Sequence, residues 1–239
     1  MRLQDQRVVI IGGTSGIGLA VAEASVAEGA RVVVASSSQS RVDTAVARLG
    51  AAAGGQVVDV TDSDAARRFF ESLDAVDHAV YTAGEALSLM PIHDLDLDRA
   101  RGFFQTRYFG ALNMVHAAAG HLRPSGSITL TSGSAGERPG AGWALAAGVC
   151  GAMNSLTRAL ALDLAPIRVN AVAPGVVRSP LWAQLSEAER DSFYAQTGAS
   201  LPVGRVGEVA DVAQAYLYCM TQSYGTGTVL NVDGGSLLI

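Results

Sequence analysis

Lysine is absent from the sequence: all 17 basic residues of the 239-residue chain are arginine. No mechanism that needs a lysine side chain can therefore operate here. Charged residues are also scarce, at 16%, and the net charge of −5 argues against nucleic acid as a main partner. Cysteine is limited to Cys150 and Cys219, which lie in apolar contexts without metal-ligand spacing, as in proteins of a reduced cytoplasm.

Several kinds of segment are missing as well. No run of about 18 or more apolar residues escapes interruption by glycine or charge, and no cleavable signal pattern opens the chain. Apolar residues make up 49% of the sequence, enough for one sizeable core. We therefore predict one domain over residues 1–239, cytoplasmic and without membrane contact. We expect no metal site, because no metal spacing relates the histidines His78, His93, His116 and His121.

Apolar, β-branched runs alternate with helical patterns along the whole chain. The runs are continuous rather than alternating, as expected for parallel strands buried on both faces. They comprise residues 7–11, 31–35, 56–60, 78–82, 127–131, 167–173 and 228–232. The helical patterns fall at residues 16–29, 40–50, 63–73, 97–121, 141–164, 183–196 and 208–221. This alternation predicts an α/β Rossmann fold, a doubly wound parallel sheet of about seven strands with helices on both faces.

A glycine-rich turn, IGGTSGIG (11–18), follows the first strand. One glycine allows a sharp turn, another lets backbone N–H groups approach a pyrophosphate, and the last lets the helix pack close to the strand. The helix that follows offers its positive N-terminus to the phosphates. A turn kept for packing alone is the alternative. We predict nucleotide binding by this turn, at the residues Gly12, Thr14, Ser15, Gly16, Ile17 and Gly18.

The second strand ends in hydroxyl side chains and an arginine: Ser36, Ser37, Ser38 and Arg41. Sites that select NAD carry a carboxylate about 20 residues after the glycine turn, and none stands here. Hydroxyls and a guanidinium instead suit a 2′-phosphate. We therefore favour NADP(H) over NAD(H) as the cofactor. The alternative is that these serines form an ordinary polar helix cap.

Further motifs follow in a fixed order: Asp59-Val60 after the third strand, YTAG (81–84) after the fourth, and then IRVNAVAPGVVRSPL, VGRVGEVADVA and LNVDGG. Together with the glycine turn they resemble the short-chain dehydrogenase/reductase family over nearly the whole chain. The resemblance implies a lid at about residues 180–204 and a homodimer or homotetramer. It also implies further cofactor contacts, at Asp59, Val60, Ala83, Gly84, Pro174, Gly175, Val177 and Ser179.

The resemblance breaks at the catalytic positions. Family members usually carry a Tyr and, four residues later, a Lys on one helix, a Ser thirteen residues before the Tyr, and an Asn on the preceding helix. The stretch LTRALALDL fixes the register of that helix, and no tyrosine lies between Tyr108 and Tyr194 to restore the pattern. The four tetrad positions are occupied by Arg107, Gly133, Ala146 and Cys150.

Two side chains remain as candidates for catalysis. Arg107 can polarise a carbonyl or bind a substrate carboxylate, although a guanidinium is a poor proton donor. The alternative is that Arg107 pairs with a nearby carboxylate. Tyr81, at the end of the fourth strand, carries a phenol that either donates a proton or only stacks. Cys150 lies mid-helix among alanines, where an inert core thiol is the expectation.

Two functions are therefore compatible with the sequence. In the first, the protein is an NADP(H)-dependent oxidoreductase that acts on a small organic carbonyl or alcohol with a non-standard proton source. In the second, it binds NADP(H) as a sensor or partner subunit without turnover. A non-redox lyase or isomerase that uses the same pocket is a third reading, and the fold alone does not decide among them.

Overall fold

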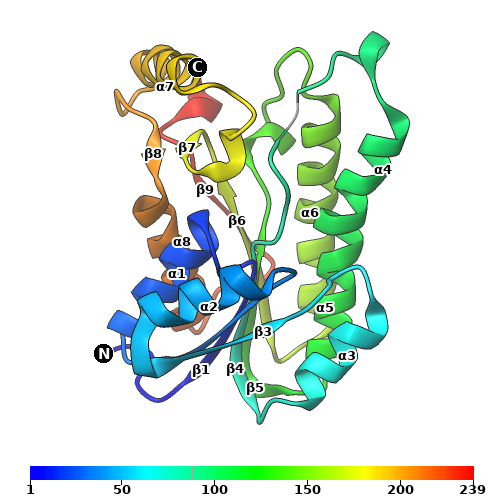
Figure 1. The fold of residues 1–239 in the computed structure, drawn as a ribbon, viewed down its shortest axis with the longest axis vertical. Helices are drawn as coiled ribbons and strands as arrows, with labels where there is room; N and C mark the ends of the chain where they lie inside the picture. Colours follow the sequence, from blue (N-terminus) through cyan, green and yellow to red (C-terminus); the bar gives the residue numbers. More distant parts are fainter. Residues whose placement is uncertain (88) are drawn as a thin grey trace.

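The computed structural model describes residues 1–87 and 89–239, in which seven parallel strands form one sheet in the order β3-β2-β1-β4-β5-β6-β9. This arrangement confirms the predicted doubly wound sheet (Figure 1). The strands are β1 (Arg7–Ile11), β2 (Arg31–Ser36), β3 (Ala53–Val57), β4 (Val76–Tyr81), β5 (Leu122–Thr131), β6 (Arg168–Pro174) and β9 (Val229–Val232).

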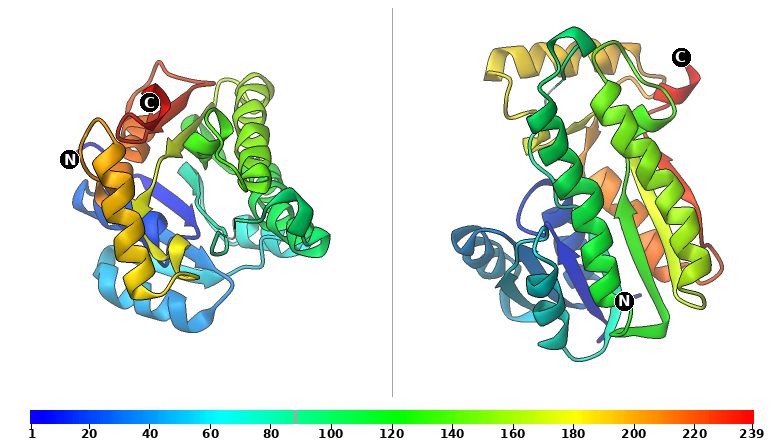
Figure 2. Two further views of the ribbon diagram at one scale, coloured as in Figure 1. Left: turned by 90° about the horizontal axis from the view of Figure 1, so that it is seen from above. Right: turned by 90° about the vertical axis from the view of Figure 1, so that its right-hand side faces the viewer.

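Helices cover both faces of the sheet, as Figures 1 and 2 show. Strand β1 serves both layers, because Val9 and Ile11 enter one hydrophobic cluster while Val8 and Ile10 enter the other. This explains why the strand runs in the sequence are continuous rather than alternating. One face is covered by α1 (Gly16–Ala27), α2 (Gln39–Leu49) and α8 (Val209–Thr221), and the other by α3 (Ser63–Glu71), α5 (Gly110–Ala118) and α6 (Ala144–Asp163).

The direction of winding reverses at β1, which pairs with β2 on one side and with β4 on the other. The connections from β1 and β4 therefore leave the sheet on opposite sides and open a crevice at the carboxyl ends of these strands. In open α/β sheets this crevice is where ligands bind. The fold thus fixes the place of the site before any side chain is considered.

Several predicted boundaries differ from those of the structure, among them the third strand and the helix 97–121. The third strand occupies Ala53–Val57 rather than 56–60, and α2 packs on it so closely that a Cβ on Gly55 would come within 2.5 Å of a Val42 methyl group. The predicted helix 97–121 is interrupted: α4 (Leu97–Phe104) and α5 are joined by one π-helical turn over Gln105–Phe109. Single π-turns of this kind are frequent at functional sites.

The predicted lid segment lies above the crevice, at the top of Figure 1. It contains a short 3-10 turn (Pro180–Trp182) and α7 (Glu187–Ser200), which Ser186 and Glu189 begin with a reciprocal capping box. A two-stranded pairing of β7 (Val177–Arg178) with β8 (Gly207–Glu208) connects both ends of the segment to the rest of the domain.

Helix α6 is long and apolar enough, by length and composition, to pass for a membrane span. In the fold its buried residues, among them Val149 and Met153, face the interior, and the helix lies against β6. Packing on the sheet therefore accounts for the buried residues of this helix, and 39% of its apolar window is buried.

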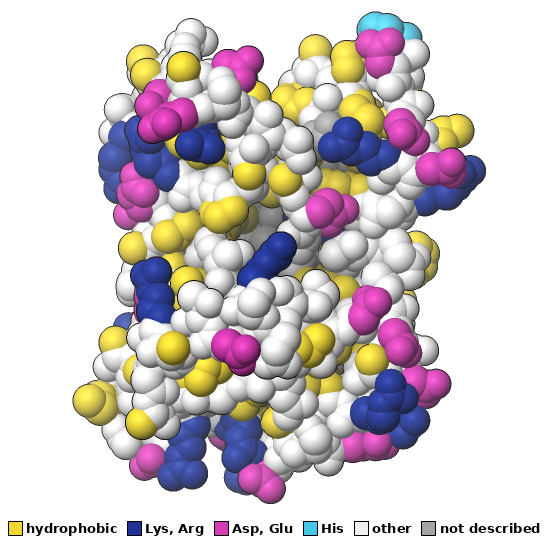
Figure 3. Space-filling model, viewed as in Figure 1, with side chains coloured by type: hydrophobic (Ala, Val, Ile, Leu, Met, Phe, Trp, Pro, Cys, Tyr) yellow, Lys and Arg dark blue, Asp and Glu magenta, His cyan; other side chains and the backbone are white. Residues whose placement is uncertain are grey.

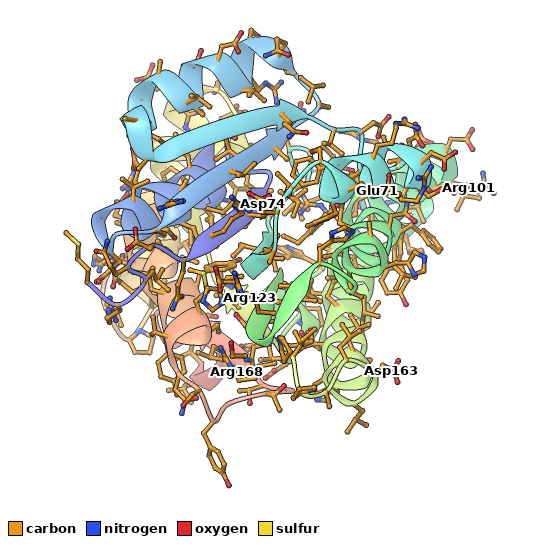
Figure 4. All side chains as sticks on the ribbon, turned by 90° about the horizontal axis from the view of Figure 1, so that it is seen from below. Glu71, Asp74, Arg101, Arg123, Asp163 and Arg168 are labelled. Atoms are coloured by element: carbon orange, nitrogen blue, oxygen red, sulfur yellow. The ribbon has the colours of Figure 1, made fainter. Side chains whose placement is uncertain are left out.

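Charged and polar side chains stabilise the end of the sheet opposite the crevice, seen from below in Figure 4. Arg168 donates to the carbonyl oxygens of Cys219 and Met220 near the end of α8, at 2.6 and 2.9 Å, where a cation offsets the helix dipole. Nearby, the buried His78 contacts Ser127 Oγ through Nδ1 and Gln6 Oε1 through Nε2, both at 2.8 Å.

Burial lowers the pKa of His78 from its ordinary 6.5 to about 4, since the charged imidazole would lose its hydration. Above pH 6.5 both the folded and the unfolded chain hold neutral imidazole. As the pH falls below that value the unfolded chain binds the proton first, so we expect the free energy of unfolding to drop by about 3 kcal/mol by about pH 4.

Denaturant unfolding at a series of pH values measures this drop. His78→Gln removes the titrating group and should flatten the pH dependence by that amount, whereas His116→Gln, at an exposed histidine, should leave it unchanged. Equal pH slopes for wild type and His78→Gln would contradict the assignment.

Candidate cofactor and substrate site

A cavity of about 670 Å³ occupies the crevice at the carboxyl ends of the strands. Figure 3 shows the surface hollowed on this face, with apolar side chains gathered above the hollow. Nearly all residues predicted to contact the cofactor line this cavity: Gly12, Thr14, Ser15, Gly16, Ile17, Gly18, Ser36, Ser37, Arg41, Asp59, Val60, Ala83, Gly84, Pro174, Gly175, Val177 and Ser179.

The glycine turn has room for backbone and none for side chains. Gly12 has a φ of +85°, and a Cβ there would come within 2.5 Å of the Ala83 nitrogen. A Cβ at Gly18 would collide with the carbonyl oxygen of Gly12. Ser15 is the N-cap of α1 and makes no side-chain cap hydrogen bond, so the first-turn N–H groups of this helix face the cavity without a capping hydroxyl. Such a cradle fits a dinucleotide pyrophosphate.

Polar groups define the far end of the cleft, where the adenosine half of a dinucleotide fits. Asp59 accepts from the backbone N–H and the hydroxyl of Thr61 through one carboxylate oxygen, at 2.9 and 2.7 Å. These bonds hold the pKa of Asp59 below its usual range, so the group is an anion that leaves its second oxygen for a ligand. Ser37 and Arg41 line the cavity from the start of α2.

Ser38 is the one predicted residue of this end that lies apart from the cavity. It is the N-cap of α2, and its hydroxyl lies 3.1 Å from that of Ser40. The turn directs its side chain toward the first turn of the helix, and the role of Ser38 as a cofactor contact stays a prediction.

The other end of the cavity is built on α6 and the loop after β5. Ala146, Cys150 and Gly133 meet there, and a Cβ on Gly133 would lie 3.0 Å from the Cys150 sulfur. The thiol thus fills the space into which a larger residue at position 133 would extend. Burial raises the pKa of Cys150, so it is a protonated thiol at neutral pH, as expected for an inert core cysteine.

Arg107 reaches this end of the cavity from the π-helical turn. Its guanidinium donates to the carbonyl oxygen of Glu85 and lies 4.4 Å from the centre of the Phe103 ring. A Cβ on Gly84 would come within 2.5 Å of Nη1, so the guanidinium lies against the backbone of the YTAG turn. The side chain is 20% exposed, and Nε lies 3.9 Å from a Glu85 carboxylate oxygen.

The carboxylate pairing considered for Arg107 is therefore present, but it is a long contact, and Nε is buried without a hydrogen-bond partner. Burial lowers the pKa of Arg107, while Glu85 acts in the opposite sense. Because an arginine pKa starts far above neutrality, the group is still a cation. The arrangement is that of a fixed, partly unsatisfied positive charge at the edge of the cavity.

Tyr81 does not line the cavity, and its role as a catalytic residue stays a prediction. Its side chain is 3% exposed, and its hydroxyl donates to the carbonyl oxygen of Thr106 at 2.5 Å. Burial raises the pKa of this phenol. Tyr81 is the first residue of the YTAG segment and the last of β4, and its ring packs in the helix layer, where its hydroxyl stabilises the π-helical turn that carries Arg107.

The comparisons with known proteins agree with this geometry. A family model described as an SDR-like Rossmann domain matches residues 1–239. Two fungal proteins named short-chain dehydrogenase/reductase are similar over 99% of this chain: fsr5 of Gibberella fujikuroi, 34% identical over 96% of its length, and ATR9 of Stachybotrys chlorohalonatus, 38% identical over 98%. The chain belongs to the short-chain dehydrogenase/reductase family.

Two solved structures of relatives cover the chain almost completely. A small-chain dehydrogenase in complex with NADPH is 36% identical, with a TM-score of 0.87 over 99% of this chain and 100% of the other. MalC Reductase/Diels-Alderase from Malbranchea aurantiaca is 29% identical, with a TM-score of 0.92 over 100% and 98%. The Rossmann domain of this family binds a nicotinamide cofactor, and the cradle described above fits one.

In this short-chain dehydrogenase/reductase the four residues that the sequence predicts at the tetrad positions all line the cavity: Arg107, Gly133, Ala146 and Cys150. Among the lining residues that the structure describes, the titratable side chains are Arg41, Asp59, Glu85, Arg107 and Cys150. The crowding of the Gly133 position by Cys150 is a geometric reason why a serine does not fit there without movement of the thiol.

Sequence reasoning missed several lining residues, namely Phe103, Glu85, Leu87, Leu181 and Trp182. The signal for Trp182 is present in the sequence, because the chain has only two tryptophans and one of them follows directly on the nicotinamide-side motif. Phe103 and Glu85 gave no such signal, since only the π-helical turn brings Arg107 between them.

Gly12→Ala tests the cradle. The substitution meets both a positive φ and the Ala83 backbone, so we expect nicotinamide-nucleotide affinity to fall by about tenfold or more, with some loss of stability. Gly54→Ala is the matched control, because a Cβ at Gly54 meets nothing within 4 Å. Calorimetric titration measures the affinity and thermal unfolding the stability; unchanged affinity in a folded Gly12→Ala protein would contradict the assignment.

Proposed function

We propose that this chain is an NADP(H)-dependent oxidoreductase that interconverts a small organic carbonyl compound and its alcohol without a tyrosine acid. The observation that carries the proposal is one cavity that combines an open nucleotide cradle with Arg107, Gly133, Ala146 and Cys150 at the tetrad positions. A bound nicotinamide supplies the hydride or takes it up, and the protein supplies position and electrostatics.

The preference for NADP(H) is supported by charge. Ser36, Ser37 and Arg41 line the adenosine end of the cavity, and within the described residues Arg41 has no ion-pair partner. A free guanidinium beside hydroxyl groups suits a 2′-phosphate, whereas a carboxylate there would repel it. The similar structure in complex with NADPH supports the same choice.

Arg41→Ala tests this preference. Loss of one charge-assisted hydrogen bond should weaken NADPH about tenfold or more and leave NADH unchanged. Arg48→Ala, on the same helix but paired with Glu23 at 2.5 Å, is the control and should alter neither affinity. Calorimetric titration with each nucleotide measures both constants. An equal loss for the two nucleotides, or tighter binding of NADH to wild type, would contradict the preference.

The role we assign to Arg107 is to stabilise negative charge on the substrate oxygen. Its buried Nε lacks a hydrogen-bond partner, and its charge lies in a partly desolvated setting, where electrostatic interactions are stronger than in water. A guanidinium does not release its proton near neutral pH, and burial holds the proton on Cys150 as well. Solvent water is therefore the proton source in this proposal.

Isotope effects separate the hydride step from the proton step. With carbonyl substrates and cofactor deuterated at the transferred position, we expect a primary isotope effect, whereas single turnover in D2O should show none, because hydride transfer first gives an oxyanion held by Arg107 and water protonates it afterwards. A normal solvent isotope effect on the hydride step would instead show that a proton moves together with the hydride, and would contradict this order.

Arg107→Ala should lower kcat about a hundredfold with unchanged cofactor affinity, the usual cost of removing one donor to a developing oxyanion. Arg101→Ala is the control, because Arg101 lies on α4 near the same turn, is 74% exposed and pairs with Asp98. Unchanged kcat in Arg107→Ala would remove this arginine from the mechanism.

Binding without turnover is the second candidate function, and the replaced tetrad favours it. The two candidates differ in one readout: a binding protein takes up NADPH stoichiometrically and never consumes it with any carbonyl compound. The description of one solved relative as a Reductase/Diels-Alderase supports retained catalysis. Assembly as a homodimer or homotetramer and a cytoplasmic location stay predictions.

A further inference from the structure

Both tryptophans of this chain line the cavity, although aromatic residues make up only 6% of the sequence. Trp143 is the N-cap residue of α6, and Trp182 ends the 3-10 turn of the lid segment. The two residues are far apart in the sequence, yet their ring centres are 6.3 Å apart with an interplanar angle of 57°. The tetrad helix and the lid therefore contribute one continuous aromatic wall.

Contacts on the side away from the cavity fix the orientation of Trp182 in this wall. Trp182 Nε1 donates to the carbonyl oxygen of Val177 at 3.1 Å, and its ring packs on Phe193 of α7 at 4.7 Å between centres. Tyr194 lies behind Phe193 at 5.8 Å, and Arg178 covers Tyr194 at 4.5 Å. Trp182 is only 6% exposed, so its orientation is set by these contacts rather than by solvent.

The residues around this wall are mostly small or apolar. Ala146 lines the cavity as a small side chain on α6, and Leu87 and Leu181, joined by a backbone hydrogen bond of 2.9 Å, line it as well. Arg107 is the cationic side chain at this end of the cavity, alongside the hydroxyls of Ser132 and Ser134 among the lining residues. Aromatic faces attract flat π-systems beyond the contribution of buried area alone.

From this arrangement we infer that the substrate is a flat, conjugated ring compound that carries a carbonyl oxygen. Its ring lies against Trp143 and Trp182, and its oxygen points toward the Arg107 guanidinium. The inference rests on the proposed function for the role of the carbonyl, while the ring preference rests on the wall itself.

The preference for a flat, conjugated ring is tested with two bicyclic ketones that have the same carbon skeleton. 1-Tetralone is conjugated and nearly flat, whereas 1-decalone is saturated and puckered. Calorimetric titrations are run on the protein saturated with NADP⁺ and on the free protein. We expect 1-tetralone to bind about threefold to tenfold more tightly than 1-decalone, the range typical of aromatic pairs.

Trp143→Leu should abolish that ratio while NADP⁺ affinity is unchanged, because leucine keeps the surface apolar without a π-face. Trp182→Leu should do the same, and Trp182→Phe is used if the leucine variant unfolds. Tyr218→Leu, at a half-exposed tyrosine of α8, is the control and should preserve the ratio.

Equal binding of the two ketones, tighter 1-decalone, absence of binding by either, or a ratio that survives both tryptophan substitutions would overturn the inference. Failure of NADP⁺ to bind would instead overturn the proposed function, and the titrations on free protein would still decide the ring preference. The two proposals can therefore fail separately.

Discussion

Backbone hydrogen bonds between three strand ends are the constraint on which the whole site depends. Gly12 donates to the carbonyl oxygen of Ala35 and Thr82 donates to that of Ile11, both at 2.8 Å, so the ends of β1, β2 and β4 are joined where the sheet reverses direction. The residue that follows β1 has to be a glycine, because a Cβ at Gly12 would collide with the turn after β4. The glycine turn, the residues Ser36 and Ser37, and the YTAG turn all start from these joined ends and line the cavity.

A second dependence runs from β4 to the cationic group. Tyr81 holds the carbonyl of Thr106, the π-helical turn projects Arg107, and the guanidinium rests on Gly84 and the Glu85 carbonyl of the segment that follows Tyr81. The segment from Tyr81 to Arg107 thus folds back on its own start, and backbone groups at both of its ends hold the guanidinium in place. Such positioning keeps a partly buried cation in place at little further entropic cost, since its neighbours are already ordered.

The sequence was informative wherever the physical signal is local. Continuous apolar runs predicted the sheet and its two helix layers, and the glycine spacing located the cradle. The sequence was less informative where contacts between distant segments decide: β3 begins at Ala53 and packs on α2 through Gly55, and neither Ser38 nor Tyr81 lines the cavity. The π-helical turn and the pairing of Trp143 with Trp182 depend on contacts between distant segments, which no single stretch of sequence encodes.

The crowded contact between Gly133 and Cys150 has a consequence for any redesign of this pocket. A Cβ at position 133 would lie 3.0 Å from the Cys150 sulfur, so a side chain can be added there only if the thiol moves or is replaced by a smaller group. Positions 133 and 150 therefore form one unit, and a change at either has to be designed together with the other.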